Sequence, residues 1–274
     1  WDDTANAAGG IVSNVTDMLT WAKFLMNDAV TKNGERLLSE QQLHELWQLQ
    51  TPLKVRANDS YNSNFRGYGL GWFVTDVKGG YKQVYHTGGL LGTVTQFTMI
   101  PDLDLAIVVL TNQMNGSAFT TITNTIKDTY LGYEDRHWLD KLGQSNEDWY
   151  KYNDSIKTEV FNKVEMMKSS PIIPKPEQIT GTFTDAWFGN MVIKKEGENL
   201  IISAENSKTI KGQLLPYNGT TFVVKWDNRS YDADCFMQFT FDEKGKAQSA
   251  KLKPIAPITD FSYDFEDLFL KRTE

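Results

Sequence analysis

The sequence predicts an α+β protein: a partial antiparallel sheet with flanking helices, followed by a small all-β, barrel-like domain. Three observations support this prediction. Up to about residue 132, segments with apolar residues at helical spacing are mixed with segments of strand-like alternation. A proline-rich connector, PIIPKP at 171–176, then interrupts the chain. After it, short alternating segments recur at regular spacing between Gly, Asn and Asp turns, which is typical of all-β domains.

Two helices are predicted near the N-terminus. The segment 11–28, IVSNVTDMLTWAKFLMND, has apolar residues at helical spacing and candidate N-caps at Ser13, Asn14 and Thr16. The next, LLSEQQLHELWQLQTP, places Ser39 and Gln42 in the positions of a capping box. Both patterns indicate amphipathic helices that cover one face of a sheet.

The sheet is predicted from the segment that follows a polar, turn-rich loop over 53–67. Its expected strands are Tyr68–Thr75, Tyr81–Tyr85, Thr93–Ile100 and Leu105–Leu110. The last of them is nearly all apolar, which predicts a strand buried on both faces. A further helix is expected over 117–132, with an apolar stripe on its buried face made of Phe119, Ile122 and Ile126.

The domain boundaries follow from changes in composition. We predict the sheet domain over residues 1–135, a charged and partly helical linker over 136–175, and the barrel-like domain over 176–274. Seven short strands are expected in the last part: GTFTD, NMVIKKEG, NLIISAE, GQLLPYNG, TFVVKWD, CFMQFTFDEKG and AQSAKLKP. Cys235, the one cysteine, is expected in the core because a free thiol behaves as a small apolar group.

Composition and motifs exclude several classes of function. A net charge of −7 argues against nucleic acid as a partner, because binding phosphates needs a basic surface. No apolar run approaches the roughly 20 residues of a membrane-spanning helix. The three His residues are scattered, and no H-E-x-x-H, phosphate-binding G-x-x-x-x-G-K-[ST] or G-x-S-x-G motif occurs. We therefore expect neither a metal nor a cofactor.

The local pattern that most suggests chemistry is Tyr85-His86-Thr87-Gly88-Gly89, written YHTGG, just after the second expected strand. Paired glycines let another backbone or a ligand approach closely, and backbone N–H groups there can stabilise an oxyanion. Threonine adds a hydroxyl, and histidine is the side chain that changes charge near neutral pH. The local residues leave open a second interpretation, a strand-end bend with an exposed histidine.

The wider sequence resembles a known family. Four segments occur in order: AAGGIVSNVTDMLTWAKFLMN, LLSEQQLHELW, GYGLGWFV and HTGGLLGTVTQFTMIPDLDLAIVVLTN. Over about residues 5–132 they resemble the C-terminal half of the catalytic domain of serine β-lactamases and penicillin-binding proteins, close to the class C branch. The resemblance implies a transpeptidase-like sheet. Residues from about 176 onward resemble the small β-rich domain often appended to these hydrolases.

Site residues follow from this resemblance. His86-Thr87-Gly88 occupies the position of the family's K-T-G motif, where related esterases and D-amino-acid peptidases often carry His first. The resemblance implies that the backbone N–H of Gly89 supplies half of an oxyanion hole. We expect His86 to act as a neutral hydrogen-bond donor, because burial disfavours a charged imidazole.

The chain departs from the family in two motifs. No Ser has a Lys three positions later, so the nucleophile motif S-x-x-K is absent, and no Y-x-N occurs. Tyr61-Asn62-Ser63 is the nearest imitation, and we interpret Tyr61 as a loop residue. The chain starts at Trp1 without an initiator Met or an apolar leader, which is consistent with a processed chain or a fragment. Together these features predict a fragment that is inactive alone.

The resulting hypothesis is a fragment of a secreted or periplasmic serine hydrolase that transfers acyl groups from amide, ester or β-lactam carbonyls. Its parent would act on a small-molecule or peptide substrate. An alternative is a non-catalytic protein of the same superfamily that binds a peptide or small ligand. We also expect self-association through an exposed sheet edge, because strands from the missing half would leave backbone groups unpaired.

Overall fold

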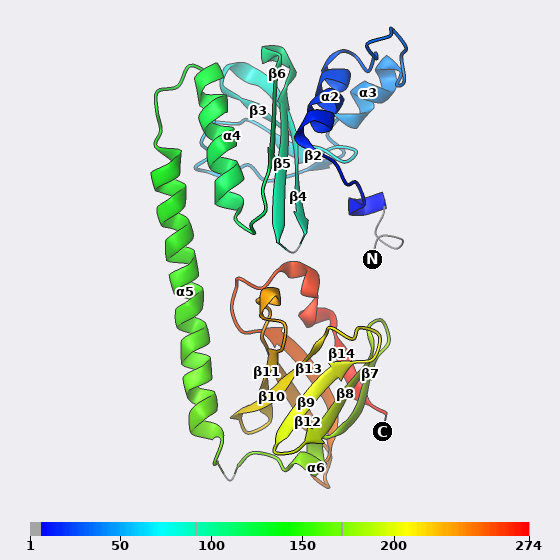
Figure 1. Ribbon diagram of the computed structural model, residues 1–274, viewed down its shortest axis with the longest axis vertical. Helices are drawn as coiled ribbons and strands as arrows, with labels where there is room; N and C mark the ends of the chain where they lie inside the picture. The colour runs from blue at the N-terminus through cyan, green and yellow to red at the C-terminus, as the bar shows by residue number, and fades with distance from the viewer. Residues whose placement is uncertain (1–6, 91, 171, 274) are drawn as a thin grey trace. The chain divides into compact units, whose positions relative to one another are not determined.

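A computed structural model describes residues 7–90, 92–170 and 172–273 (Figure 1). The chain divides into two compact units, residues 1–146 and residues 147–274. Unit 1 holds a six-stranded sheet with helices, and unit 2 holds a closed barrel. The predicted α+β class with a barrel-like C-terminal domain is therefore confirmed. The finer boundaries at residues 135 and 175 stay predictions.

The sheet of unit 1 is antiparallel throughout, in the order β1-β2-β3-β4-β5-β6. Its strands are β1 Thr51–Pro52, β2 Arg66–Tyr68, β3 Phe73–Val77, β4 Tyr81–Leu90, β5 Thr93–Ile100 and β6 Leu105–Leu110. Short turns join neighbours from β2 onward, so sequential order equals spatial order. Both faces of β6 are packed, as the apolar sequence predicted, although β6 lies at the edge of the sheet.

One expected strand, Tyr68–Thr75, is wrong. The chain turns inside it: β2 ends at Tyr68 and β3 starts at Phe73, and these two residues pair across a hairpin. Gly69 explains the turn, because a Cβ there would lie 2.5 Å from the carbonyl oxygen of Leu46. Gly71 adds a φ of +80°, a value that side chains disfavour. The glycines of YGLGWF thus mark a turn within an apolar run.

Helices α2 Val15–Met26 and α3 Glu40–Leu46 cover one face of this sheet (Figure 1). Asn14 is the N-cap of α2 and accepts a hydrogen bond from the N–H of Asp17 at 3.0 Å. The predicted capping box of α3 is present, with both the Ser39 and Gln42 bonds formed. Their apolar residues pack with Val84, Phe97 and Met99 from the sheet, and we call this surface the α2 face.

Helix α4, Gly116–Tyr130, covers the opposite face, which we call the α4 face. The predicted apolar stripe is largely on the wrong side of it: Ile122 is 46% exposed and Ile126 is 37% exposed. The helix instead buries Thr123, Lys127 and Asp128. Polar partners from the sheet and from the loop before β2 make this possible, and helical periodicity alone does not reveal them.

Within the charged segment, which was predicted to be partly helical, the structure has one 30-residue helix, α5 Trp138–Met167. Within unit 2 its residues Val160 and Val164 pack on Val223, Ile255 and Ala256, which lie on the outside of the barrel. A short helix, α6 Pro176–Ile179, starts at the last proline of PIIPKP. Pro171 lies outside the described residues.

Unit 2 is an antiparallel barrel that closes in the order β10-β11-β12-β13-β14-β7-β8-β9. Its strands are β7 Gly181–Asp185, β8 Gly189–Glu196, β9 Asn199–Ala204, β10 Lys211–Asn218, β11 Thr221–Trp226, β12 Cys235–Phe241, β13 Ala247–Pro254 and β14 Phe269–Arg272. Seven of these strands were predicted, and β14 was missed. Cys235 is fully buried in the single apolar cluster that fills the barrel, as expected.

No helix among the described residues is long and apolar enough to cross a membrane.

Candidate active-site strand

The YHTGG segment lies inside β4 rather than beyond its end. His86, Thr87, Gly88 and Gly89 all pair with β5, and the ladder continues to Leu90. The segment is therefore regular strand rather than a bend, and its role in a site stays a prediction. The β5 side of the segment is therefore fixed by a regular ladder, which makes the backbone geometry of all four predicted site residues well defined.

The other side of the same segment is open. Strand β3 starts at Phe73, which pairs with Tyr85, so among the described residues β3 does not accompany β4 past that point. Because alternate backbone groups of a strand point to opposite sides, half of the N–H and C=O groups of residues 86–90 face away from β5. They form a row of polar backbone groups without a strand partner in the part of the chain that the structure describes.

Two aromatic residues from the β2–β3 hairpin hold the His86 side chain. The Tyr68 hydroxyl lies 3.0 Å from Nε2 of His86, and the Phe73 ring stacks on the imidazole with centroids 5.6 Å apart. Nδ1 of His86 lies 2.6 Å from the carbonyl oxygen of Thr87. A carbonyl only accepts, so Nδ1 carries the proton of the neutral ring and Nε2 accepts from Tyr68.

This arrangement bears on the expected role of His86. In the neutral ring the single N–H is directed to Thr87, and the lone pair of Nε2 is directed to Tyr68. Donation of a hydrogen bond from neutral His86 to a substrate therefore requires the ring to leave one of these partners. The role of His86 as a neutral hydrogen-bond donor stays a prediction, and it requires the imidazole to move away from Thr87 or Tyr68.

Gly88 and Gly89 leave this part of the strand without projecting side chains. A Cβ on Gly88 would meet the hydroxyl of Thr95 at 2.6 Å, whereas a Cβ on Gly89 would meet nothing within 4 Å. Both residues are exposed and neither has a positive φ, so backbone strain does not explain the pair. The glycine at position 89 leaves open space beside the unpaired strand edge, which suits close approach by a ligand backbone or a reacting carbonyl.

The structure brings together His86, Thr87, Gly88 and Gly89 and adds Tyr68, which sequence analysis missed. Tyr68 follows a glycine in GYGLGWF, and no local pattern points from it to His86, 18 residues later. The other two histidines, His44 and His137, are both exposed and belong to α3 and to the segment before α5. No cluster of three metal-ligating side chains occurs among the described residues.

Two protein families match different parts of the chain. Residues 1–129 match the family described as Beta-lactamase. Residues 175–272 match a second family, described as Domain of unknown function (DUF3471).

One curated relative is the protein named Unguisins hydrolase ungD' from Aspergillus campestris (strain IBT 28561). It is 25% identical over 237 residues, which are 80% of this chain and 41% of the relative. The chain thus spans about two fifths of the length of that relative.

Two solved structures are similar over nearly the whole chain. The octameric penicillin-binding protein homologue from Pyrococcus abyssi has 14% identity and a TM-score of 0.39, with 95% of this chain and 48% of that chain covered. A structure of SurE has 15% identity and a TM-score of 0.34, with 97% and 49% covered. The chain spans about half the length of each.

Proposed function

We propose that this chain, whose residues 1–129 form a domain of the Beta-lactamase family, supplies one wall of the active site of a serine acyl hydrolase. The observation that carries the proposal is the open edge of β4 at His86–Leu90. This edge contains the pair Gly88-Gly89 and the imidazole of His86, which the Tyr68 hydroxyl contacts. Such an edge can align an extended substrate by backbone hydrogen bonds and direct an N–H group at a developing oxyanion.

The proposed reaction is acyl transfer. A serine hydroxyl adds to the carbonyl carbon of an amide, ester or β-lactam and gives up its proton to a base. The tetrahedral oxyanion collapses, and the amine or alcohol leaves with a proton. Water then adds to the acyl-enzyme ester and releases the acid and the free serine. In this scheme the N–H of Gly89 stabilises the oxyanion and Tyr68 orients His86.

The nucleophile is proposed to come from a segment outside these 274 residues, because the chain contains no S-x-x-K and no Y-x-N. On this proposal the chain alone is inactive. A relative named as a hydrolase of unguisins supports hydrolysis as the reaction of the whole protein. We further propose a small-molecule or peptide substrate and a secreted or periplasmic location, both inferred from the resemblance.

Covalent labelling tests the proposal. The 274-residue chain and a longer protein that includes an upstream S-x-x-K segment are incubated separately with a fluorophosphonate and with a penicillin. Mass spectrometry is expected to find no stoichiometric adduct on the chain alone and one adduct on the longer protein. Stoichiometric acylation of a serine within this chain would contradict the fragment hypothesis. No adduct on the longer protein would favour the non-catalytic binding alternative.

Kinetics of the longer protein test the role of His86. His86→Ala is expected to lower kcat/KM about tenfold to a thousandfold, the range for loss of one positioned donor or proton-transfer group. Tyr68→Phe keeps the edge-to-face ring contact with His86 but removes the hydroxyl, so we expect a smaller loss and a changed pH profile. Unchanged kcat/KM in His86→Ala would remove this strand from the mechanism.

A further inference from the structure

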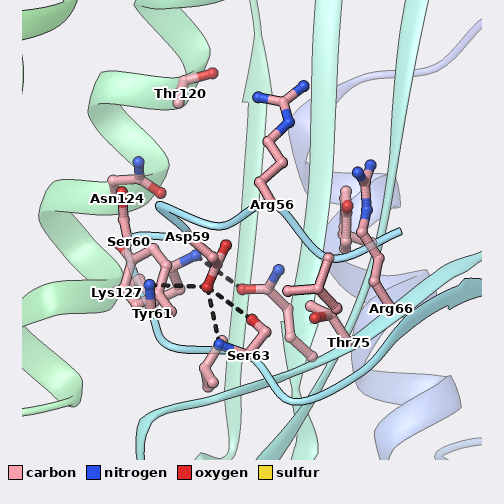
Figure 2. A pocket seen from close by; sticks show the side chains of 14 residues that line it. Arg56, Asp59, Ser60, Tyr61, Ser63, Arg66, Thr75, Thr120, Asn124 and Lys127 are labelled. Atoms are coloured by element: carbon pink, nitrogen blue, oxygen red, sulfur yellow. Dashed lines mark hydrogen bonds between the residues drawn. The ribbon is translucent and has the colours of Figure 1, made fainter. Parts of the chain in front are cut away.

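A cavity lies on the α4 face of the sheet, and the proposed function does not use it. Its volume is about 310 Å³, and its walls come from the loop before β2, from strands β2 to β4 and from α4 (Figure 2). Tyr85 lines it, whereas the next residue, His86, pairs with Phe97 of the α2 face. Tyr85 is the one residue of the YHTGG segment in the cavity lining, so the cavity is distinct from the site residues His86, Thr87, Gly88 and Gly89.

The loop that forms one wall is fixed by hydrogen bonds. Asp76 on β3 accepts from the backbone N–H of Asn64 at 2.7 Å and from that of Phe65 at 3.1 Å. Asp59 accepts from the N–H of Tyr61, and from both the N–H and the hydroxyl of Ser63. The cavity is therefore bounded by anchored backbone rather than by a free loop.

Lys127 lies in this wall as a buried cation with few partners. It is 4% exposed. Its ammonium donates to Oε1 of Gln83 at 2.9 Å and lies 3.6 Å from the centroid of the Tyr61 ring. An ammonium has three N–H donors, so these contacts leave donor capacity on a residue that lines the cavity. Buried charges in proteins are normally paired, because removing an ion from water is costly.

The carboxylate next in sequence does not meet this need. Asp128 accepts from the Tyr61 hydroxyl at 2.8 Å and from the indole N–H of Trp138 at 2.6 Å, and it lies 3.8 Å from Arg136. Asp59 is the one carboxylate among the residues that line the cavity. Burial alone raises the pKa of Asp59, but the bonds from Ser63 and Tyr61 outweigh burial and hold it below its usual value.

Two guanidinium groups add positive charge to the same cavity. Arg56 and Arg66 both line it, so three cations face one carboxylate. Nε of Arg66 is buried and has no hydrogen-bond partner among the described residues. A buried donor without a partner costs about 1–3 kcal/mol, which an acceptor in the cavity would recover.

We propose that this cavity is a binding site for a small organic oxyanion, with its carboxylate or phosphate head group between Lys127 and Arg66 and with Arg56 at the exposed rim. The guanidinium fork and the ammonium are the donors that proteins use for such head groups. The volume is at the small end of ligand pockets, and Tyr61, Tyr85 and two valines give it an apolar part.

The pH dependence of binding follows from Lys127. Burial lowers the pKa of Lys127 to about 8. The positive charge of Arg136 also lowers this pKa, whereas the negative charges of Asp128 and Asp59 raise it and offset part of the effect. The ammonium is mostly charged at pH 7 and mostly neutral at pH 9.5. Anion affinity is therefore expected to fall by about tenfold or more over that range.

Calorimetric titration of the 274-residue chain tests the proposal with two probes, sodium benzoate and inorganic phosphate, at pH 7 and low ionic strength. Saturable binding of one anion per chain is expected for at least one probe, and the probe that binds identifies the head group. Lys127→Met and Arg66→Gln are each expected to weaken binding at least tenfold. Lys54→Gln, which changes charge by the same amount outside the cavity, is expected to change affinity less than twofold.

Absence of saturable binding of both probes would overturn the proposal. So would equal weakening by Lys54→Gln and Arg66→Gln, because that result indicates a diffuse charge effect. Far-UV circular dichroism reports whether each variant folds. If Lys127→Met does not fold, Arg66→Gln and the exposed Arg56→Gln decide the outcome. The test needs no enzymatic activity, so its failure leaves the acyl hydrolase proposal untouched.

Discussion

The barrel of unit 2 and the sheet of unit 1 differ in how completely they satisfy their polar groups. The barrel closes its ladder, so in the described chain every one of its strands has a neighbour on both sides. The sheet ends at β6 and leaves part of β4 open. Four buried side-chain atoms lack a hydrogen-bond partner among the described residues, and all four belong to unit 1: Trp47 Nε1, Arg66 Nε, Gln96 Oε1 and Thr123 Oγ1.

Buried carboxylates are well satisfied in both units, and the contrast lies in one buried cation. In the barrel, Asp185 accepts three backbone N–H groups, and Asp234 accepts two bonds from Arg229 and one from the N–H of Trp226. In unit 1, Lys127 is buried with one hydrogen bond and one aromatic face. Well-satisfied polar groups specify and stabilise a fold, whereas each unsatisfied group needs its own explanation, such as strain, a functional role or an ordered water.

The largest expected effect on stability comes from a substitution that creates a cavity in the core of the barrel. Phe222 is 1% exposed inside the apolar cluster, so Phe222→Ala is expected to lower the free energy of unfolding of unit 2 by about 3–5 kcal/mol. Ile122→Ala, on the exposed side of α4, is expected to change stability by about 0.5 kcal/mol or less. Urea unfolding followed by circular dichroism measures both. Similar losses in the two variants would contradict the described burial.

The pH dependence of stability tests the buried cation. The pKa of Lys127 is about 8 in the folded chain and 10.5 in the unfolded chain. Between these values the unfolded state holds the proton and the folded state does not, so stability rises with pH. From pH 7.5 to 9.5 the expected gain is about 2 kcal/mol.

Urea unfolding at the two pH values measures this gain, and the comparison with Lys127→Met removes the contribution of every other group. The variant is expected to lack the gain, whereas Lys54→Gln keeps it. An equal rise in wild type and Lys127→Met would show that Lys127 is not a buried cation in solution. That result would remove the main difference between the two units.

Sequence analysis predicted the barrel strands and the helices of the α2 face well, and it predicted the buried face of α4 and the polar contacts poorly. The capping box at Ser39 and the buried Cys235 follow from local pattern and intrinsic preference. The orientation of α4 does not, because Lys127 and Asp128 are buried by partners 44 and 67 residues away, Gln83 and Tyr61. The bond between Tyr68 and His86 is likewise tertiary. Periodicity shows how apolar residues are spaced along an element. It carries no information on which polar side chains form hydrogen bonds in the folded chain.

A smaller loss of stability is expected from removing the N-cap of α3, and it identifies which unfolding transition belongs to unit 1. Ser39 accepts from the N–H of Gln42 at 3.1 Å and caps α3, so Ser39→Ala is expected to cost about 1 kcal/mol. Because α3 packs in the cluster of the α2 face, the loss should appear in unit 1 alone. A shift of the barrel transition instead would indicate that the two units unfold as one.

The last prediction concerns β6, the edge strand of the sheet, and is expected to change stability least. Strand β6 has the sequence LAIVVL, pairs only with β5 among the described residues, and contains neither charge nor proline. Uncharged, β-branched edges of this kind favour pairing with a second copy. We therefore expect the chain to self-associate as concentration rises. Leu110 is 43% exposed at the end of β6, so Leu110→Lys is expected to change stability by about 0.5 kcal/mol or less and to weaken association.

Light scattering after size-exclusion chromatography, over a hundredfold range of concentration, measures this association. The matched control is Tyr130→Lys, which adds the same charge at a residue that is 56% exposed on α4 and does not belong to a strand. Only the β6 variant should shift the chain towards a monomer, because a lysine at a strand edge opposes pairing locally, whereas net charge acts on both variants alike. A monomer at every concentration would mean that the edge is protected in solution. Equal shifts in the two variants would assign association to a surface other than β6.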